Sequence, residues 1–79
     1  DSKFNFSARL EIDYLNEEYH LNILKSEAYE TLGGFIIEHT ENIPEEKELI
    51  EIDNLEFKIL KMSGAKIDEV SLKVINPED

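Results

Sequence analysis

The sequence predicts an α+β domain in the order β-α-α-β-β-β, with two helices packed on one face of an antiparallel sheet. Three observations lead to this prediction. Apolar and polar residues alternate near the N-terminus and again after residue 48, which is the period of half-buried strands. Between residues 11 and 41 the apolar residues recur every three to four positions, as on amphipathic helices. Short turn signals join the last three strands, so we expect these strands to form an antiparallel meander.

Phe4 and Phe6 predict a short first strand, because they alternate with polar residues and would share the core side of the sheet. The first helix is predicted over about Glu11 to His20, where the apolar period changes. Its apolar stripe consists of Ile12, Leu15 and Tyr19, and its polar side of Asp13, Asn16, Glu17 and Glu18.

A connector from Leu21 to Lys25 follows this helix. We expect its apolar members to fill the edge of the core; these are Leu21, Ile23 and Leu24. Ser26 is expected to cap either a short turn or the second helix, since a serine hydroxyl can accept a hydrogen bond from a free backbone N–H.

The second helix is predicted from about Glu27 or Glu30 to Glu41. Asn42 can adopt the left-handed conformation that ends a helix, and Pro44 prevents its continuation. The residues that recur at helical spacing in this segment are Leu32, Phe35, Ile36, His39 and Ile43.

The second strand is predicted at Leu49–Ile52, after an acidic loop. Asp53-Asn54 is a two-residue hairpin signal, because both residue types tolerate positive φ. The third strand has its inward face at Leu55, Phe57 and Ile59, and its outward face at Glu56, Lys58 and Lys61.

Ser63-Gly64 predicts the turn into the last strand. The inward residues of that strand are Val70, Leu72 and Val74. Ile67 is out of phase with them, which predicts a bulge near Asp68. Residues 76–79 are expected to form a frayed tail.

Gly33 and Gly34 lie within the predicted second helix, where each glycine costs about 1 kcal/mol relative to alanine. Close packing of the helix backbone against the sheet, where a Cβ would not fit, would offset this cost. The alternative is a phosphate-binding loop, which needs glycines before the helix N-terminus and a Lys, Ser or Thr after them. Phe35 and Ile36 follow instead, so packing is favoured. A site for a flavin dinucleotide is also disfavoured, because the sequence has no glycine-rich loop that could bind its pyrophosphate.

Composition narrows the function classes. The 79 residues suit one small domain, and the net charge of −11 argues against nucleic-acid binding and against direct contact with an anionic membrane surface. The chain has no cysteine for a disulfide, a metal site or a nucleophile, and no apolar run of the roughly 20 residues that cross a bilayer. It begins at Asp1 rather than Met, so we expect an excised piece of a longer protein.

The candidate chemical groups do not assemble into a site. His20 and His39 lack a complete zinc ligand set, although Glu38 and Asn42 lie near His39 in sequence. The segment Glu45–Glu48, with Glu51 and Asp53 nearby, could collect Mg²⁺ or Ca²⁺ weakly, but a solvated acidic face is favoured over a dedicated site. No serine lies in a nucleophile-elbow sequence. No catalytic, cofactor-binding or metal-binding residue is therefore predicted, and we expect the chain not to be an enzyme.

Five segments carry a family resemblance: Ile12–Glu17, Tyr29–Ile36, Ile43–Glu46, Leu55–Leu60 and Lys66–Val70. Together they resemble the transporter-associated domain at the C-terminus of CorC/HlyC-type, hemolysin-related membrane proteins, over nearly the whole chain. The most specific element is the Tyr-x-Thr-Leu-Gly-Gly-apolar segment, followed about ten residues on by Ile-Pro. Where the family often has glycine, this chain has Asp53-Asn54 and His20, whose residue types also tolerate the left-handed region.

The resemblance implies a fold similar to part of the PCMH-type FAD-binding domains. It implies a parent with a transmembrane domain and a cytoplasmic pair of CBS domains, followed by residues 1–79 as a single domain on the cytoplasmic side of the membrane. The parents are linked to magnesium and cobalt efflux or divalent-cation homeostasis. The expected function is therefore a non-catalytic regulatory one, through contacts with the rest of the chain or in a homodimer. The alternative is a sensing module for a divalent cation or an adenine-containing small molecule.

Four apolar residues fall where the periodicity points them away from the core: Ile37, Ile50, Leu60 and Ile75. They could form a surface patch for docking to the CBS pair or for self-association. They could equally wrap around the core, and the sequence leaves both interpretations open.

Overall fold

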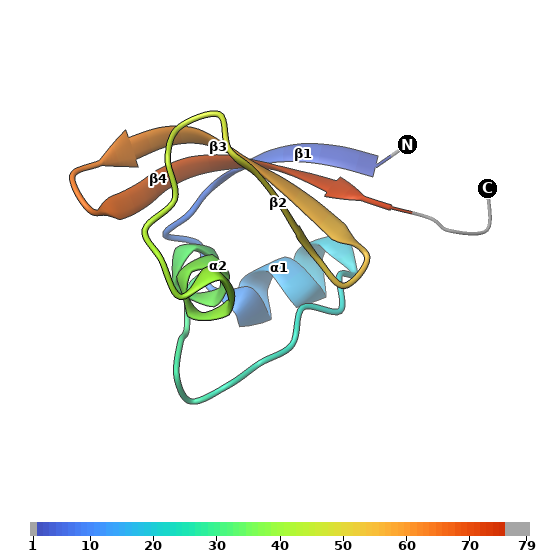
Figure 1. Ribbon diagram of the computed structural model, residues 1–79. Helices are drawn as coiled ribbons and strands as arrows, with labels where there is room; N and C mark the ends of the chain where they lie inside the picture. Colours follow the sequence, from blue (N-terminus) through green and yellow to red (C-terminus); the bar gives the residue numbers. More distant parts are fainter. Residues whose placement is uncertain (1, 76–79) are drawn as a thin grey trace.

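Four antiparallel strands form one sheet in the order β1-β4-β3-β2. The structure is a computed structural model, which describes residues 2–75 and places both helices on the same side of this sheet (Figure 1). The elements are β1 Ser2–Ser7, α1 Ile12–Tyr19, α2 Leu32–Thr40, β2 Leu49–Ile52, β3 Leu55–Ser63 and β4 Lys66–Val74. The predicted fold class, element order and meander are confirmed. The predicted tail at residues 76–79 lies outside the described residues.

Aromatic rings join the two layers of the core. Phe57 of β3 is fully buried, and its ring centroid lies 6.0 Å from that of Phe35 on α2. Tyr19 of α1 has its ring centroid 5.2 Å from that of Phe4 and 5.0 Å from that of Phe6. Each such pair adds about 0.5–1.5 kcal/mol to the burial of its rings. These contacts fix both helices against the sheet.

Helix α1 forms within the predicted range. Glu11 is its extended N-cap, and His20 ends it in the left-handed conformation at φ 56°. Ile12 and Leu15 of its apolar stripe are buried. The tolerance of histidine for the left-handed region thus lets it stand where glycine is common.

Helix α2 begins later than predicted, at Leu32 rather than Glu27 or Glu30. The preceding chain is held extended, because Thr31 forms an isolated antiparallel bridge with Glu11. Thr31 is therefore the N-cap, and its Oγ1 accepts a hydrogen bond from the N–H of Gly34 at 3.2 Å. Ser26 serves the turn rather than the helix, since its Oγ accepts from the Ala28 N–H at 3.0 Å.

The end of α2 also differs from the prediction. The helix stops at Thr40, and Glu41 rather than Asn42 takes the left-handed conformation, at φ 60°. The Glu41 N–H donates to the Ile37 carbonyl at 2.8 Å, which closes the last turn one residue early. Ile43, which recurs at the helical spacing but follows the predicted helix end, lies outside α2 with 56% of its surface exposed.

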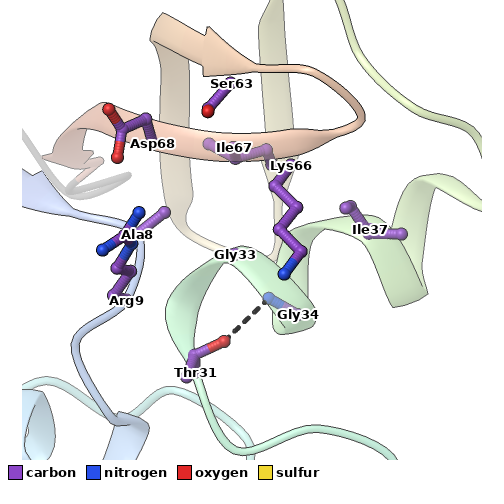
Figure 2. A pocket seen from close by; sticks show the side chains of 10 residues that line it. All are labelled: Ala8, Arg9, Thr31, Gly33, Gly34, Ile37, Ser63, Lys66, Ile67 and Asp68. Atoms are coloured by element: carbon purple, nitrogen blue, oxygen red, sulfur yellow. Dashed lines mark hydrogen bonds between the residues drawn. The ribbon is translucent and has the colours of Figure 1, made fainter.

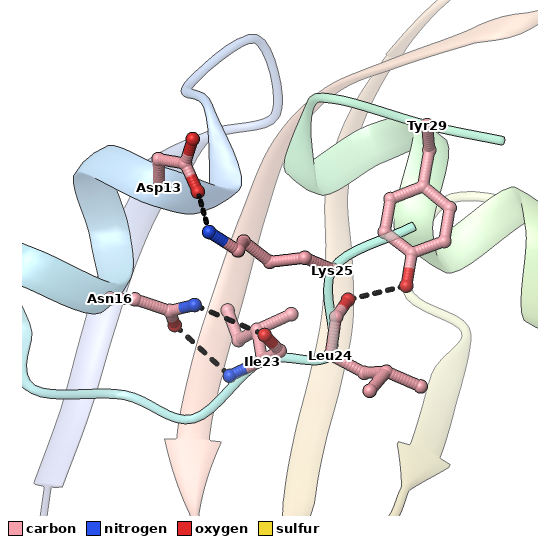
Figure 3. Close-up of polar contacts among 6 residues, drawn as sticks. All are labelled: Asp13, Asn16, Ile23, Leu24, Lys25 and Tyr29. Atoms are coloured by element: carbon pink, nitrogen blue, oxygen red, sulfur yellow. Dashed lines mark hydrogen bonds and ion pairs between the residues drawn. The ribbon is translucent and has the colours of Figure 1, made fainter. Parts of the chain in front are cut away.

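The connector between the helices is pinned by one side chain. Asn16 of α1 donates through Nδ2 to the Ile23 carbonyl and accepts through Oδ1 from the Ile23 N–H, both at 3.0 Å (Figure 3). Asn16 belongs to the predicted polar side of α1, and this loop covers it, so it is half-buried. Leu21 and Ile23 are buried as expected, whereas Leu24 is 64% exposed, so its expected place at the core edge was wrong.

The strand faces follow the prediction with one reversal. Asp53 turns the β2–β3 hairpin at φ 55°. The pairing slips between Lys61 and Met62 on β3, opposite Glu69 and Ile67 on β4, which leaves Asp68 as the predicted extra residue. Ile50 was expected to point outward, but it is partly buried on the core, and Leu49 is the exposed residue.

Candidate functional site

A cleft of about 420 Å³ lies where the β3–β4 turn, the β1–α1 turn and the start of α2 meet (Figure 2). Ala8, Gly33, Ile37 and Ile67 give it an apolar lining. Its polar lining consists of Arg9, Thr31, Ser63, Lys66 and Asp68. The Gly33-Gly34 pair borders this cleft, so the phosphate interpretation can be judged here from the backbone amides.

The backbone amides at the start of α2 all have partners. The N–H of Leu32 donates to the Leu10 carbonyl at 3.0 Å, and that of Gly33 to the Ala8 carbonyl at 2.9 Å. The N–H of Gly34 donates to the Thr31 hydroxyl. A phosphate cradle needs such amides free to meet the anion, so this helix start does not act as one.

The two glycines allow close packing of the helix start, as predicted, but mainly against a different partner. A Cβ on Gly33 would lie 3.2 Å from the Ala8 Cβ and 3.3 Å from the Ala8 carbonyl oxygen. A Cβ on Gly34 would lie 3.0 Å from the Tyr29 Cβ. The close approach is therefore to the β1–α1 turn and to the preceding loop, and only secondarily to the sheet, because the glycines occupy the first turn of α2.

The two histidines lie in separate places. His39 was assigned to the apolar stripe of α2, but it is exposed. Its ring covers Phe35 at a centroid distance of 4.5 Å, and its Nδ1 lies 3.0 Å from the Phe35 carbonyl oxygen. His20 caps the other helix. Within residues 2–75, no three His, Asp or Glu side chains come together as metal ligands would.

Two carboxylates of the acidic loop bind backbone amides. Glu46 accepts from the Met62 N–H at 3.1 Å, next to the bulge where the β3 pairing is irregular. Glu48 accepts from the Glu45 N–H at 2.9 Å. These bonds give Glu46 and Glu48 a structural role in holding the loop. Weak cation binding by this loop stays a prediction.

One tyrosine and one lysine beside the connector have raised pKa values. Burial, and to a lesser extent the charge of Glu38, raises the pKa of Tyr29, whose hydroxyl donates to the Leu24 carbonyl (Figure 3). The hydrogen bond to Asp13, at 2.9 Å, raises the pKa of Lys25. Because that ion pair is exposed, it adds little stability. These groups hold the loop and show no arrangement for proton transfer.

The face of the sheet away from the helices is less acidic than the helical layer. Residues 11–42 contain eight acidic residues and one lysine. The uncovered face carries four exposed lysines, which are Lys3, Lys58, Lys61 and Lys73. It also carries three glutamates, since Glu56 pairs with Lys73, Glu69 with Lys61 and Glu51 with Glu56. Within the described residues, the ion pair under 4 Å is that of Lys25 with Asp13, so these four lysines have no carboxylate that close. We define these lysines and glutamates, together with exposed Leu49 and Leu60, as the open face.

The sequence anticipated this face only in part. Lys58, Lys61 and Leu60 were predicted to point outward, and they do. The accumulation of lysines could not be read along the chain, because Lys3 and Lys73 become neighbours only through the β1–β4 pairing. Alternation within each strand predicts which residues share a face of that strand. The strand order is also needed to tell which of these residues become neighbours on the sheet.

A sequence model of the CorC_HlyC family, described as a transporter associated domain, matches residues 1–76. The chain is 33% identical over 82 residues to the UPF0053 protein sll0260 of Synechocystis. That alignment covers 100% of this chain but 18% of the Synechocystis protein, so the chain spans about a fifth of the length of its curated relative.

Two solved structures share the fold. One is a transporter associated CorC_HlyC domain from a Xylella fastidiosa hemolysin in complex with Mg²⁺ and Mn²⁺, with 27% identity, a TM-score of 0.76, and coverage of 94% of this chain and 89% of that one. The other is the associated region of a proposed Mg²⁺ and Co²⁺ transporter (CorC) from Neisseria meningitidis. It has 20% identity, a TM-score of 0.83, and coverage of 95% and 91% of the two chains. In the described part of the present chain, no helix is long and apolar enough to cross a membrane.

Proposed function

Because this chain belongs to the CorC_HlyC transporter-associated domain family, we propose that it is a non-catalytic regulatory domain of a membrane-bound protein of magnesium and cobalt efflux or homeostasis. It acts through protein–protein contacts on the cytoplasmic side of the membrane. Its expected partners are a CBS-domain pair and the transmembrane domain of the same chain, or a second copy in a homodimer.

The observation that carries this proposal is the open face. Leu49 is 62% exposed and Leu60 is 36% exposed on a sheet surface that no helix covers. Adjoining exposed apolar residues rimmed by polar ones are typical of surfaces that meet another protein, and Leu49 and Leu60 lie on the neighbouring strands β2 and β3. The CorC name of the Neisseria relative supports a link to divalent cations, and the short span within the Synechocystis relative supports a larger parent.

The test uses the full-length parent and a deletion of the segment equivalent to residues 1–79, both reconstituted in vesicles. Mg²⁺ flux is followed with an internal fluorescent indicator. We expect the deletion to change the dependence of flux on Mg²⁺ without abolishing flux, and the purified domain to bind the deleted parent saturably. Unchanged flux together with no binding would contradict the proposal.

A second candidate is a sensing module that binds a divalent cation or an adenine-containing molecule. The observation that favours it is the Xylella domain solved with Mg²⁺ and Mn²⁺. Amide chemical shifts of the domain, titrated with Mg²⁺, Co²⁺, ATP and FAD in turn, separate the two functions. Saturable shifts on one surface support sensing. Small shifts spread over the acidic residues, without saturation, indicate counterion screening and leave the docking function.

A further inference from the structure

Two tyrosine rings of α1 remain exposed on the helical layer. Tyr14 is 46% exposed and Tyr19 is 38% exposed. Their ring centroids lie 6.4 Å apart, and the ring planes meet at 77°. Tyr19 also packs at a steep angle against Phe4 and Phe6 of β1, which fixes its ring and gives Tyr14 a fixed neighbour. We call Tyr14 and Tyr19 the tyrosine pair, whose open ring surface is thus held in place before any partner arrives.

Carboxylates border Tyr14 along the chain. Residues three and four positions apart are neighbours on a helix surface, and Glu11, Glu17 and Glu18 stand at these separations from Tyr14. All three glutamates are exposed. Tyr19, partial desolvation and the negative charge of Glu18, in that order, raise the pKa of Tyr14, as expected where a carboxylate lies beside the ring. The tyrosine pair therefore offers aromatic surface bordered by negative charge.

Basic side chains are scarce around the tyrosine pair. Residues 11–42 include one lysine, Lys25, and its ammonium lies 2.9 Å from the Asp13 carboxylate. Arg9 precedes the helix in sequence, but its side chain lines the cleft at the start of α2 (Figure 2). Within the described part of the chain, the three bordering carboxylates have no lysine, arginine or histidine nitrogen within 4 Å. Their negative charge is therefore open to a partner.

Aromatic faces and carboxylates together match a guanidinium group. A guanidinium is attracted to an aromatic face through its positive charge, and its planar array of N–H groups donates to a carboxylate. A divalent metal ion is a poorer match, because Mg²⁺ and Ca²⁺ need several oxygen ligands at once. No three His, Asp or Glu side chains within residues 2–75 come together for that purpose.

We propose that the tyrosine pair binds an arginine side chain from a basic segment of a partner polypeptide, with the guanidinium on the ring of Tyr14 and bonded to Glu18. The inference rests on the proposed function for the source of that segment. Membrane domains carry an excess of Lys and Arg in their short cytoplasmic loops, so a regulatory domain on that side of the membrane meets basic segments of its own parent.

Charge complementarity selects this partner. Residues 11–42 carry eight exposed acidic residues against one lysine, whereas the open face mixes lysines with glutamates and has no such preference. The negative charge of the helical layer is repelled by anionic lipid, and it attracts the basic loops that border the lipid. One exposed arginine contact is weak, so the partner needs several basic residues, of which the others reach further carboxylates of the layer.

The experiment is an amide chemical-shift titration of the 79-residue domain at physiological salt. The probe is an acetylated, amidated hexapeptide of four arginines and two glycines, and the matched probe has neutral citrulline in place of each arginine. We expect saturable shifts centred on Tyr14, Glu18 and Tyr19 with the arginine peptide, and none that saturate with the citrulline peptide. Saturation with neither peptide, or equally with both, would overturn the proposal. Saturation of the same amides by Mg²⁺ alone, at an equal or lower concentration than the arginine peptide, would overturn it too.

Variants test the named groups. Tyr14→Leu should weaken binding of the arginine peptide about threefold, whereas Tyr14→Phe keeps the ring and should weaken it less than about twofold. Glu18→Gln should weaken binding about threefold. Glu27→Gln is the matched control and should weaken it less than about 1.5-fold. Glu27 follows the connector, which Asn16 holds on the side of α1 away from Tyr14.

Well-dispersed amide spectra of each variant confirm folding. Equal weakening by Glu18→Gln and Glu27→Gln would indicate nonspecific charge attraction and overturn the proposal. Unchanged binding by Tyr14→Leu would overturn it as well, because the ring would then contribute nothing.

This result is distinguishable from a failure of the proposed function. If the arginine peptide binds but deletion of the domain leaves Mg²⁺ flux unchanged, the regulatory function is refuted and the arginine site stands. If deletion alters flux but the peptide does not bind, the arginine site is refuted and the regulatory contact lies elsewhere on the domain.

Discussion

Replacing Asn16 with alanine removes both side-chain bonds that tie the connector between the helices to α1. In the folded domain these bonds join Asn16 to the backbone N–H and carbonyl of Ile23, each at 3.0 Å. The side chain of Ile23 is 3% exposed, so the loop cannot move its backbone into water without also exposing a core residue. The perturbation therefore reaches the core through the loop.

The magnitude follows from the bond count. Each hydrogen bond contributes about 1 kcal/mol net, and the half-buried partner groups left behind add a desolvation penalty, so Asn16→Ala should lower the free energy of unfolding by about 2–3 kcal/mol. For a domain of this size, 1 kcal/mol corresponds to roughly 4–8 °C in Tm. We expect a Tm decrease of about 10–20 °C from these values.

The assay is urea unfolding followed by circular dichroism, with thermal melts as a second readout. Asn22→Ala is the matched control, because Asn22 is exposed and its side chain makes no hydrogen bond within the described residues, so its effect should be within about 0.5 kcal/mol. Asn16→Asp keeps the acceptor and loses the amide donor, and should fall between the two. If Asn16→Ala and Asn22→Ala were equally stable, the clamp would have no energetic role and the reasoning would be refuted.

Three further perturbations test the helix start and the buried tyrosine. Gly33→Val should destabilise the domain by about 1–3 kcal/mol in urea, because its Cβ would meet Ala8 at 3.2 Å; unchanged stability would show that the turn yields. Thr31→Ala should cost about 1 kcal/mol through loss of the N-cap, and a larger loss in Ser26→Ala would contradict the assignment of the cap. Burial raises the pKa of Tyr29 above its ordinary value of about 10, so its neutral form stabilises the fold below that pH and this stability is lost as pH rises beyond it. Tyr29→Phe should therefore flatten the fall of Tm between about pH 9 and 11, and an identical fall in both proteins would argue against a buried hydroxyl.

Much of the fold was predictable because its signals are local. The alternation of Leu55, Phe57 and Ile59 identifies the inward face of β3, and the phase break at Ile67 identifies the bulge. The errors occur where a partner distant in sequence overrides the local pattern. The bridge from Thr31 to Glu11 delays α2, and the clamp from Asn16 holds a loop that reads as ordinary connector.

The candidate surface was less predictable than the fold. A lysine on a strand reads as a solvated side chain, and nothing in its own segment distinguishes Lys3 or Lys58 from Lys66. Ser71 reads as an ordinary outward residue of a strand. Its burial depends on neighbours from two other strands, so it could not be derived before the strand order was known.

The sequence by itself determined the element types, the inward faces, the glycine packing and the family resemblance, because each depends on the periodicity and residue types of short segments. Only the tertiary structure decided which strands are neighbours and which face the helices leave open. It also decided that the amides at the start of α2 are already used. The physical reason is that side-chain alternation specifies two faces for each strand but not the order of strands in a sheet. Charges far apart in the chain, such as Lys3 and Lys73, therefore meet only when the sheet assembles.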